Sequence, residues 1–68
     1  MVRVIVNGVS FYTTKKKLVD GVGSDSNINA AVSTVYSMLK KEHRGIGTRI
    51  TVYDNKMVAR SFDVQIDL

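Results

Sequence analysis

Arginines and tyrosines on the predicted strands are the side chains of this sequence best suited to chemistry with a ligand. Arg3, Tyr12, Arg49 and Tyr53 alternate with apolar residues, so we expect them on the sheet face opposite the core. Tyrosines that stack bases and arginines that hold phosphates are typical of open sheets that bind nucleic acid. The same residues are also common on exposed strands for reasons of β-propensity alone.

Lysines form the densest charge cluster of the chain, at Lys15, Lys16 and Lys17. Adjacent lysines suit contacts with a phosphate backbone, whose strength depends on the salt concentration and which do not discriminate between base sequences. A solvated loop is the alternative interpretation. Lys40, Lys41 and Arg44 form a second cluster at the end of a predicted helix, where cations also stabilise the helix dipole. Ten Lys and Arg against six Asp and Glu give a net charge of +4, which favours an anionic partner.

Arg60 is a further candidate contact, and its position depends on the turn of the second predicted hairpin. A two-residue turn at Asp54 and Asn55 places Arg60 opposite Arg49 on the outer face. Like charges in that position destabilise a sheet unless an anion or a carboxylate lies between them. A three-residue turn instead pairs Ile50 with Arg60 and directs Arg60 toward the core. The sequence leaves both registers open.

Catalytic and metal-binding groups are too few in this chain to form a familiar site. It contains one histidine (His43), no cysteine and six carboxylates, which are scattered among predicted turns and along the last strand. A catalytic triad needs a nucleophile, a base and an orienting group, and a zinc site needs several His, Cys or carboxylate ligands. We therefore expect a protein that is not an enzyme and that holds no metal and no cofactor.

The glycines ahead of the predicted helix form another candidate site. Free N–H groups at a helix N-terminus bind anions, and Gly21, Gly23 and Ser24 stand just before such a terminus. The spacing matches neither the Walker pattern nor the dinucleotide fingerprint, and Asp20 and Asp25 would repel a phosphate. A flexible connection that ends in a capped helix is the favoured interpretation.

The first predicted element is a β-hairpin over residues 2–14. Asn7 and Gly8 favour a two-residue type I′ turn because both residues tolerate a positive φ. Arg3 then lies directly across from Tyr12 on one face. The register gathers the apolar side chains on the other face: Val2, Val4, Val6, Val9 and Phe11.

Residues 15–26 are expected to form a loop, and a helix is predicted over about residues 27–44. In the loop, Leu18 and Val19 are the side chains that could reach the core. Cations in the last helical turns and Gly45 after them are typical of a helix C-terminus. Apolar residues at three- and four-residue spacing indicate the helix, namely Ile28, Ala31, Val32, Val35, Met38 and Leu39.

A second β-hairpin is expected from about Gly47 to the end of the chain. Its last run, residues 57–68, is longer than its partner strand, so half of this run must pair with residues 2–6 or with a strand of another copy. These elements predict an α+β fold of ββαββ order, in which one helix covers one face of a four-stranded, mostly antiparallel sheet. The length of 68 residues suffices for a single domain.

Size and composition also bear on assembly and location. A domain this small without disulfides is expected to gain stability from tight packing or from self-association, which favours a homo-oligomer. No apolar run reaches the roughly 18 residues that span a bilayer, and residues 1–6 are too short and too alternating for a signal peptide. A cytoplasmic setting therefore fits best.

Three functions remain open from the sequence. The first is a basic module that binds DNA or RNA with the lysine cluster and the Arg/Tyr sheet face. The second is an inhibitory or accessory protein of the kind found in phages and mobile elements, an analogy based on size alone. Such a protein could add its long last strand to a partner's sheet, or dock through Ile5, Tyr12 and Tyr53. The third is a homo-oligomer that holds a small anion, such as a nucleotide, between subunits with residues 21–26 and the lysines. The basic composition favours the first.

Overall fold

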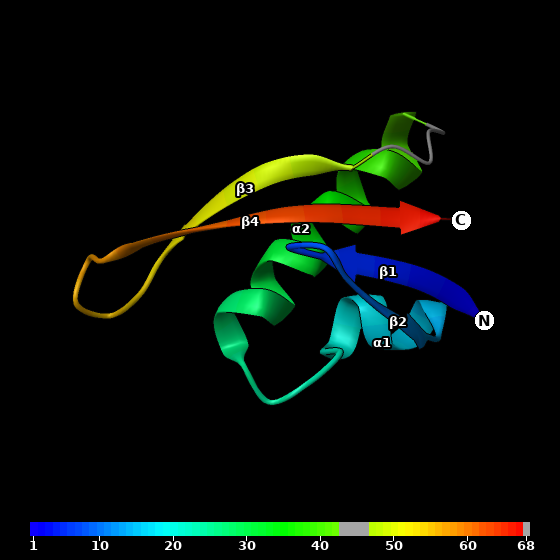
Figure 1. The fold of residues 1–68 in the computed structure, drawn as a ribbon, viewed down its shortest axis with the longest axis horizontal. Coiled ribbons are helices and arrows are strands. Elements are labelled where there is room, and N and C mark those ends of the chain that lie inside the picture. The colour runs from blue at the N-terminus through cyan, green and yellow to red at the C-terminus, as the bar shows by residue number, and fades with distance from the viewer. Residues whose placement is uncertain (43–46, 68) are drawn as a thin grey trace.

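Four antiparallel strands form one sheet, and two helices cover one of its faces (Figure 1). The computed structural model describes residues 1–42 and 47–67. The strand order β2-β1-β4-β3 makes β2 and β3 the edges. The predicted α+β fold of ββαββ order is confirmed, with one helix more than expected. The elements are β1 (Val2–Val6), β2 (Val9–Thr13), α1 (Lys15–Asp20), α2 (Ser26–Glu42), β3 (Thr48–Tyr53) and β4 (Ala59–Asp67).

The β1–β2 hairpin has the predicted register and the predicted turn. Arg3 pairs with Tyr12, and Asn7 and Gly8 adopt φ values of 50° and 84°, as a type I′ turn requires. The expectation that Val9 lies in the core is wrong, because it stands at the turn end of an edge strand, and 67% of it is exposed.

Residues 15–20 form the helix α1, so the prediction of a loop over residues 15–26 is wrong for its first half. The Thr14 hydroxyl caps this helix by accepting a hydrogen bond from the N–H of Lys17, and the N–H of Gly21 closes it on the carbonyl of Lys17. Leu18 is only 1% exposed and joins the core, whereas Val19 points to solvent. One buried side chain in six residues leaves no periodic pattern, so the apolar spacing carries no sign of this helix.

The helix α2 closely matches its predicted range and packs its apolar stripe on the sheet. Asp25 caps it, since Oδ1 accepts from the N–H of Asn27 at 2.9 Å and from the N–H of Ile28 at 3.3 Å. Met38 belongs to the predicted stripe but is 42% exposed. The predicted end of the helix at His43, Arg44 and Gly45 lies outside the described residues. The buried residues of α2 are Ala31, Val32, Val35, Tyr36 and Leu39.

The strand β4, which is the long last strand predicted from the sequence, lies inside the sheet and pairs with strands of its own chain on both sides. Its C-terminal half pairs with β1, from Val6 opposite Val64 to Arg3 opposite Asp67. Its N-terminal half pairs with β3. Pairing within the chain is therefore the correct alternative. Inward side chains of β1 and β4 form the floor on which the helices pack: Val2, Val4, Val6, Phe62, Val64 and Ile66.

The β3–β4 hairpin has neither of the two registers considered from the sequence. Val52 pairs with Arg60, and residues 54–58 make the connection. The turn is built on Asp54, whose carbonyl accepts from the N–H of Met57 and whose side chain accepts from the N–H of Val58 at 2.9 Å. Met57 has a φ of 61°, as expected for the left-handed residue that follows a type I turn in a bulged hairpin.

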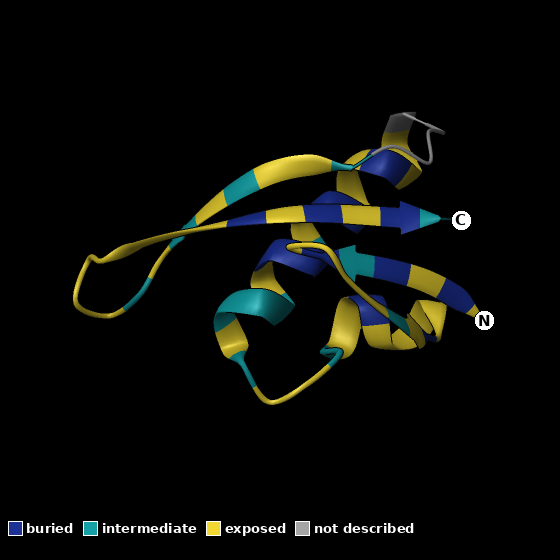
Figure 2. Ribbon diagram, viewed as in Figure 1, coloured by how far each residue is buried: buried dark blue, intermediate teal, exposed yellow. Residues whose placement is uncertain are grey.

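The end of this hairpin, residues 51–61, projects beyond the helices, and we call it the hairpin arm. Figure 2 shows that the arm is mostly exposed, in contrast to the buried part of β4. Tyr53, Met57 and Val58 are 61%, 75% and 54% exposed. The arm therefore presents apolar side chains that the described part of the chain does not cover.

Candidate nucleic-acid interface

The outer face of the sheet, which points away from the helices, carries four of the predicted contacts. Arg3 and Tyr12 are cross-strand neighbours on β1 and β2. Arg49 and Tyr53 lie on β3, separated from β1 by the whole of β4. Both tyrosines are more than half exposed. The structure therefore confirms the predicted face but divides the four residues into two pairs.

Arg3 is neutralised by a carboxylate of the neighbouring strand. Its Nε donates a hydrogen bond to Oδ2 of Asp67 at 2.7 Å, because the ladder places the two residues opposite each other. The hydrogen bond from Arg3 lowers the pKa of the Asp67 carboxyl, and the same bond raises the pKa of Arg3. Both groups stay charged at neutral pH, and together they carry no net charge.

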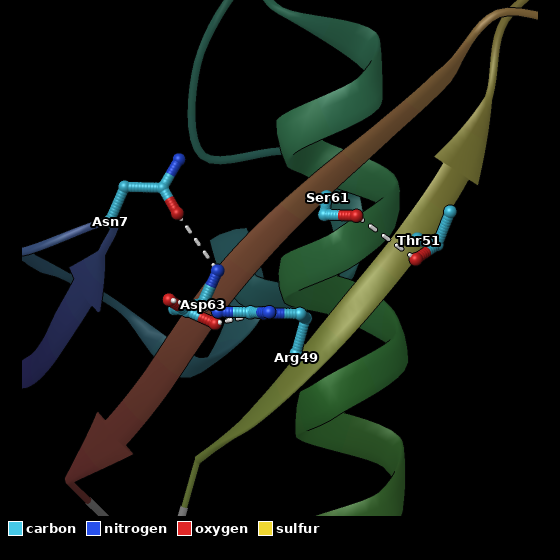
Figure 3. A network of polar contacts seen from close by, with 5 residues as sticks. All are labelled: Asn7, Arg49, Thr51, Ser61 and Asp63. Carbon is cyan, nitrogen blue, oxygen red and sulfur yellow. Dashed lines mark hydrogen bonds and ion pairs between the residues drawn. The ribbon is translucent and has the colours of Figure 1, made fainter.

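Arg49 is neutralised in the same way by Asp63 (Figure 3). Its Nε and Nη2 donate to the two carboxylate oxygens at 2.8 and 3.3 Å, a bidentate arrangement. The hydrogen bond from Arg49 lowers the pKa of Asp63. The backbone of Asp63 is held by Asn7, whose N–H donates to the Asp63 carbonyl and whose Oδ1 accepts from the Asp63 N–H, each at 2.8 Å.

The Arg/Tyr face therefore has a different electrostatic character from the one expected. A phosphate at Arg49 or Arg3 would lie beside the carboxylate of Asp63 or Asp67, whose negative charge offsets the attraction of the guanidinium group. The two aspartates were visible in the sequence as the polar residues of an alternating strand. Only the strand order puts them beside the arginines, and the strand order could not be read from the sequence.

Arg60 lies on the opposite face of the sheet from Arg3 and Arg49. It pairs with Val52 and shares the helix-side face with Phe62. Of the two placements left open by the sequence, the position opposite Arg49 is therefore wrong, and the core-side placement has the correct face although its register differs. Its guanidinium lies 5.0 Å from the centre of the Phe62 ring and its Nη1 is 3.4 Å from Oδ2 of Asp25. Arg60 thus links the hairpin arm to the start of α2.

Lysines supply the charge that the arginines do not. Lys15, Lys16 and Lys17 form the first turn of α1 and are exposed, and so are Lys40 and Lys41 in the last turn of α2. Within residues 1–41 and 47–67, none of these five lysines forms an ion pair. Figure 1 shows that the start of α1 and the end of α2 lie at the same end of the molecule, opposite the hairpin arm. We call these five residues the lysine end.

The start of α2 is closed by the chain's own side chains. The N–H groups of Val22 and Gly23 both donate to Oδ1 of Asn29 at 3.0 Å. Those of Asn27 and Ile28 donate to Asp25, and these bonds, that of Ile28 foremost, lower the Asp25 pKa. The anion site considered from the sequence therefore lacks these four donors.

An open groove of about 570 Å³ lies on the outer face of the sheet, along β4. Ile5 and Gln65 line it together with the paired Arg49 and Asp63. Binding pockets enclose most of a ligand, whereas this groove is shallow and its charges are matched. It does not provide a separate site for an anion.

Neither known proteins nor other types of binding site identify a function for this chain. No family model matches the chain, and no curated protein or solved structure matches it significantly. Within residues 1–42 and 47–67, no three His, Asp or Glu side chains gather as a metal ion would require. Neither described helix has the length and apolar character needed to cross a membrane.

Proposed function

We propose that the protein is a non-enzymatic module that binds nucleic acid through the lysine end. One observation supports this choice of surface. Each arginine among the described residues is paired with an aspartate, whereas the five lysines at this end have no ion-pair partner within residues 1–41 and 47–67. Five of the six lysines of the chain lie at this end, and a cation without an ion pair attracts phosphate with no carboxylate to offset it.

The geometry of α1 suits a phosphate backbone rather than a single phosphate. Successive helical residues are about 100° apart around the axis, so Lys15, Lys16 and Lys17 point in different directions. A flexible ammonium at each position can reach a separate phosphate. Such contacts are insensitive to sequence and weaken with salt. The exposed Tyr12 ring, on the strand that leads into α1, is available for base stacking.

Fluorescence anisotropy with labelled random oligonucleotides at several salt concentrations tests the proposal. The triple variant K15Q/K16Q/K17Q should bind more weakly, and its plot of log affinity against log salt should be less steep by about 2 to 3 for duplex DNA. The double variant R49Q/D63N removes one paired cation and its anion and leaves the net charge unchanged, so it should bind like the unmodified protein. Loss of binding in R49Q/D63N with full binding in the triple variant would refute the proposal.

Protein binding is a second candidate, favoured by the exposed apolar side chains of the hairpin arm. Tyr53, Met57 and Val58, near its tip, are each more than half exposed, and tyrosine and methionine are enriched in protein interfaces. Of the two arguments that the sequence offers for this candidate, addition of β4 to a partner sheet does not apply because β4 has neighbours on both sides. Capture of a protein after nuclease treatment, abolished by Tyr53→Ser, would favour this candidate over nucleic acid.

A further inference from the structure

The strand β3 is an edge whose backbone groups are open to a partner. The N–H of Asp54 donates to the carbonyl of Val58, so the backbone of Asp54 faces β4. Antiparallel residues alternate in direction, and therefore the N–H and C=O groups of Arg49, Thr51 and Tyr53 face away from β4. Because β3 is the last strand in the order, no described strand receives these bonds.

This edge lacks the features that keep sheet edges apart. Its sequence Thr-Arg-Ile-Thr-Val-Tyr contains no proline, lysine or acidic residue, and the one charge, on Arg49, is already matched by Asp63. The other edge, β2, is shorter, and the same alternation leaves only Ser10 and Tyr12 facing outward there. The second half of the longer edge, residues 51–53, belongs to the hairpin arm, which Figure 2 shows to be mostly exposed.

The order of side chains along β3 is complementary to itself. An antiparallel copy related by a two-fold axis at Thr51 places Arg49 opposite Tyr53 on the outer face. It places Ile50 opposite Val52 on the helix face, and Thr51 opposite Thr51. These are favourable cross-strand pairs, and the first repeats the pairing of Arg3 with Tyr12 within the chain.

We propose that a second copy of the chain pairs with β3 in this register, so that two four-stranded sheets join into one. All three outward-facing residues of each copy exchange backbone hydrogen bonds, about six in total. The half-buried Ile50 and Val52 are covered further, and the tip of each arm lies beside the start of β3 in the other copy. The interface uses the same edge on both copies, so assembly closes at the dimer.

A proline scan of the two edges tests the interface. Thr51→Pro removes an N–H that faces away from β4, so it blocks the dimer without removing a backbone hydrogen bond of the monomer. It does remove the exposed hydrogen bond between the hydroxyls of Thr51 and Ser61 within the chain. Ser10→Pro removes an N–H that faces away from β1 and is the matched control on the other edge. In sedimentation experiments on nuclease-treated protein, Thr51→Pro should weaken dimerisation about tenfold or more, and Ser10→Pro should leave it within about twofold. Circular dichroism confirms that both variants fold.

Charge substitution at the two-fold axis provides a second, independent measurement. Thr51→Lys and Thr51→Glu each bring like charges together and should each be more monomeric than the unmodified chain. A one-to-one mixture pairs Lys with Glu and should restore the dimer. The proposal is overturned by a monomeric unmodified chain at about 1 mM, by dissociation with Ser10→Pro alone, or by a mixture no more dimeric than its components. None of these outcomes depends on nucleic-acid binding.

Discussion

Replacement of Met57 by glycine should stabilise the protein, because the backbone at this position favours glycine. Met57 has a φ of 61°, a conformation that costs a residue with a Cβ about 1–2 kcal/mol. Glycine avoids this cost but loses about 0.5–1 kcal/mol through its greater freedom in the unfolded chain. The side chain is 75% exposed, so little packing is lost. The net gain should be about 0.5–1 kcal/mol, which raises the Tm of a domain of this size by about 3–6 °C.

Thermal unfolding followed by circular dichroism measures this gain, with Met57→Ala as the matched control. Alanine also removes the exposed side chain but keeps the Cβ, so it should leave the Tm close to that of the unmodified chain. Glycine should exceed alanine by several degrees. A Tm for Met57→Gly equal to or below that of Met57→Ala would show that the turn does not place residue 57 in the left-handed region.

Three further perturbations test the packing and the ion pairs. Leu18→Ala should cost about 2–4 kcal/mol in urea unfolding because Leu18 anchors α1 in the core, whereas Val19→Ala should change stability by less than about 0.5 kcal/mol. Gly47→Ala should destabilise by about 1–3 kcal/mol since a Cβ would come within 2.7 Å of the Gln65 Cα; Gly23→Ala, which meets nothing within 4 Å, is its control. Three carboxyls have pKa values lowered by folding, so the stability they contribute is present above about pH 4 and lost as the pH falls through the lowered values. The Tm should fall across that acid range, and a constant or rising Tm would contradict the pairing of these residues: Asp25, Asp63 and Asp67.

The first hairpin and α2 could be predicted from the sequence because local rules determine them. Asn7 and Gly8 fix both the turn and the register of β1 and β2, so Arg3 falls opposite Tyr12 as expected. The apolar stripe of α2 repeats often enough to reveal its period. In contrast, α1 has one buried residue, Leu18, and only the Thr14 cap and Gly21 mark its ends.

The charge balance of the outer face could not be predicted from the sequence, because it results from contacts between segments that are distant along the chain. The pairing of Arg3 with Asp67 joins residues at the two ends of the chain, and only the central position of β4 brings them together. The face on which Arg60 lies depends on the turn, and the turn requires Met57 to adopt a positive φ. Glycine is the usual residue in that conformation, so a methionine gives no sign of this turn in the sequence. Sequence reasoning therefore identified the residues of the outer face but not their charge balance.

The location of bound nucleic acid tests the proposed function most directly. Backbone amide NMR spectra recorded during titration with a short random oligonucleotide report which residues are affected. We predict that the largest shifts fall on residues 14–20 and 38–42, around the lysine end, and that they disappear at high salt. Shifts concentrated on Arg49, Asp63 and the other residues of the outer face, or no shifts at all, would contradict the assignment of this surface.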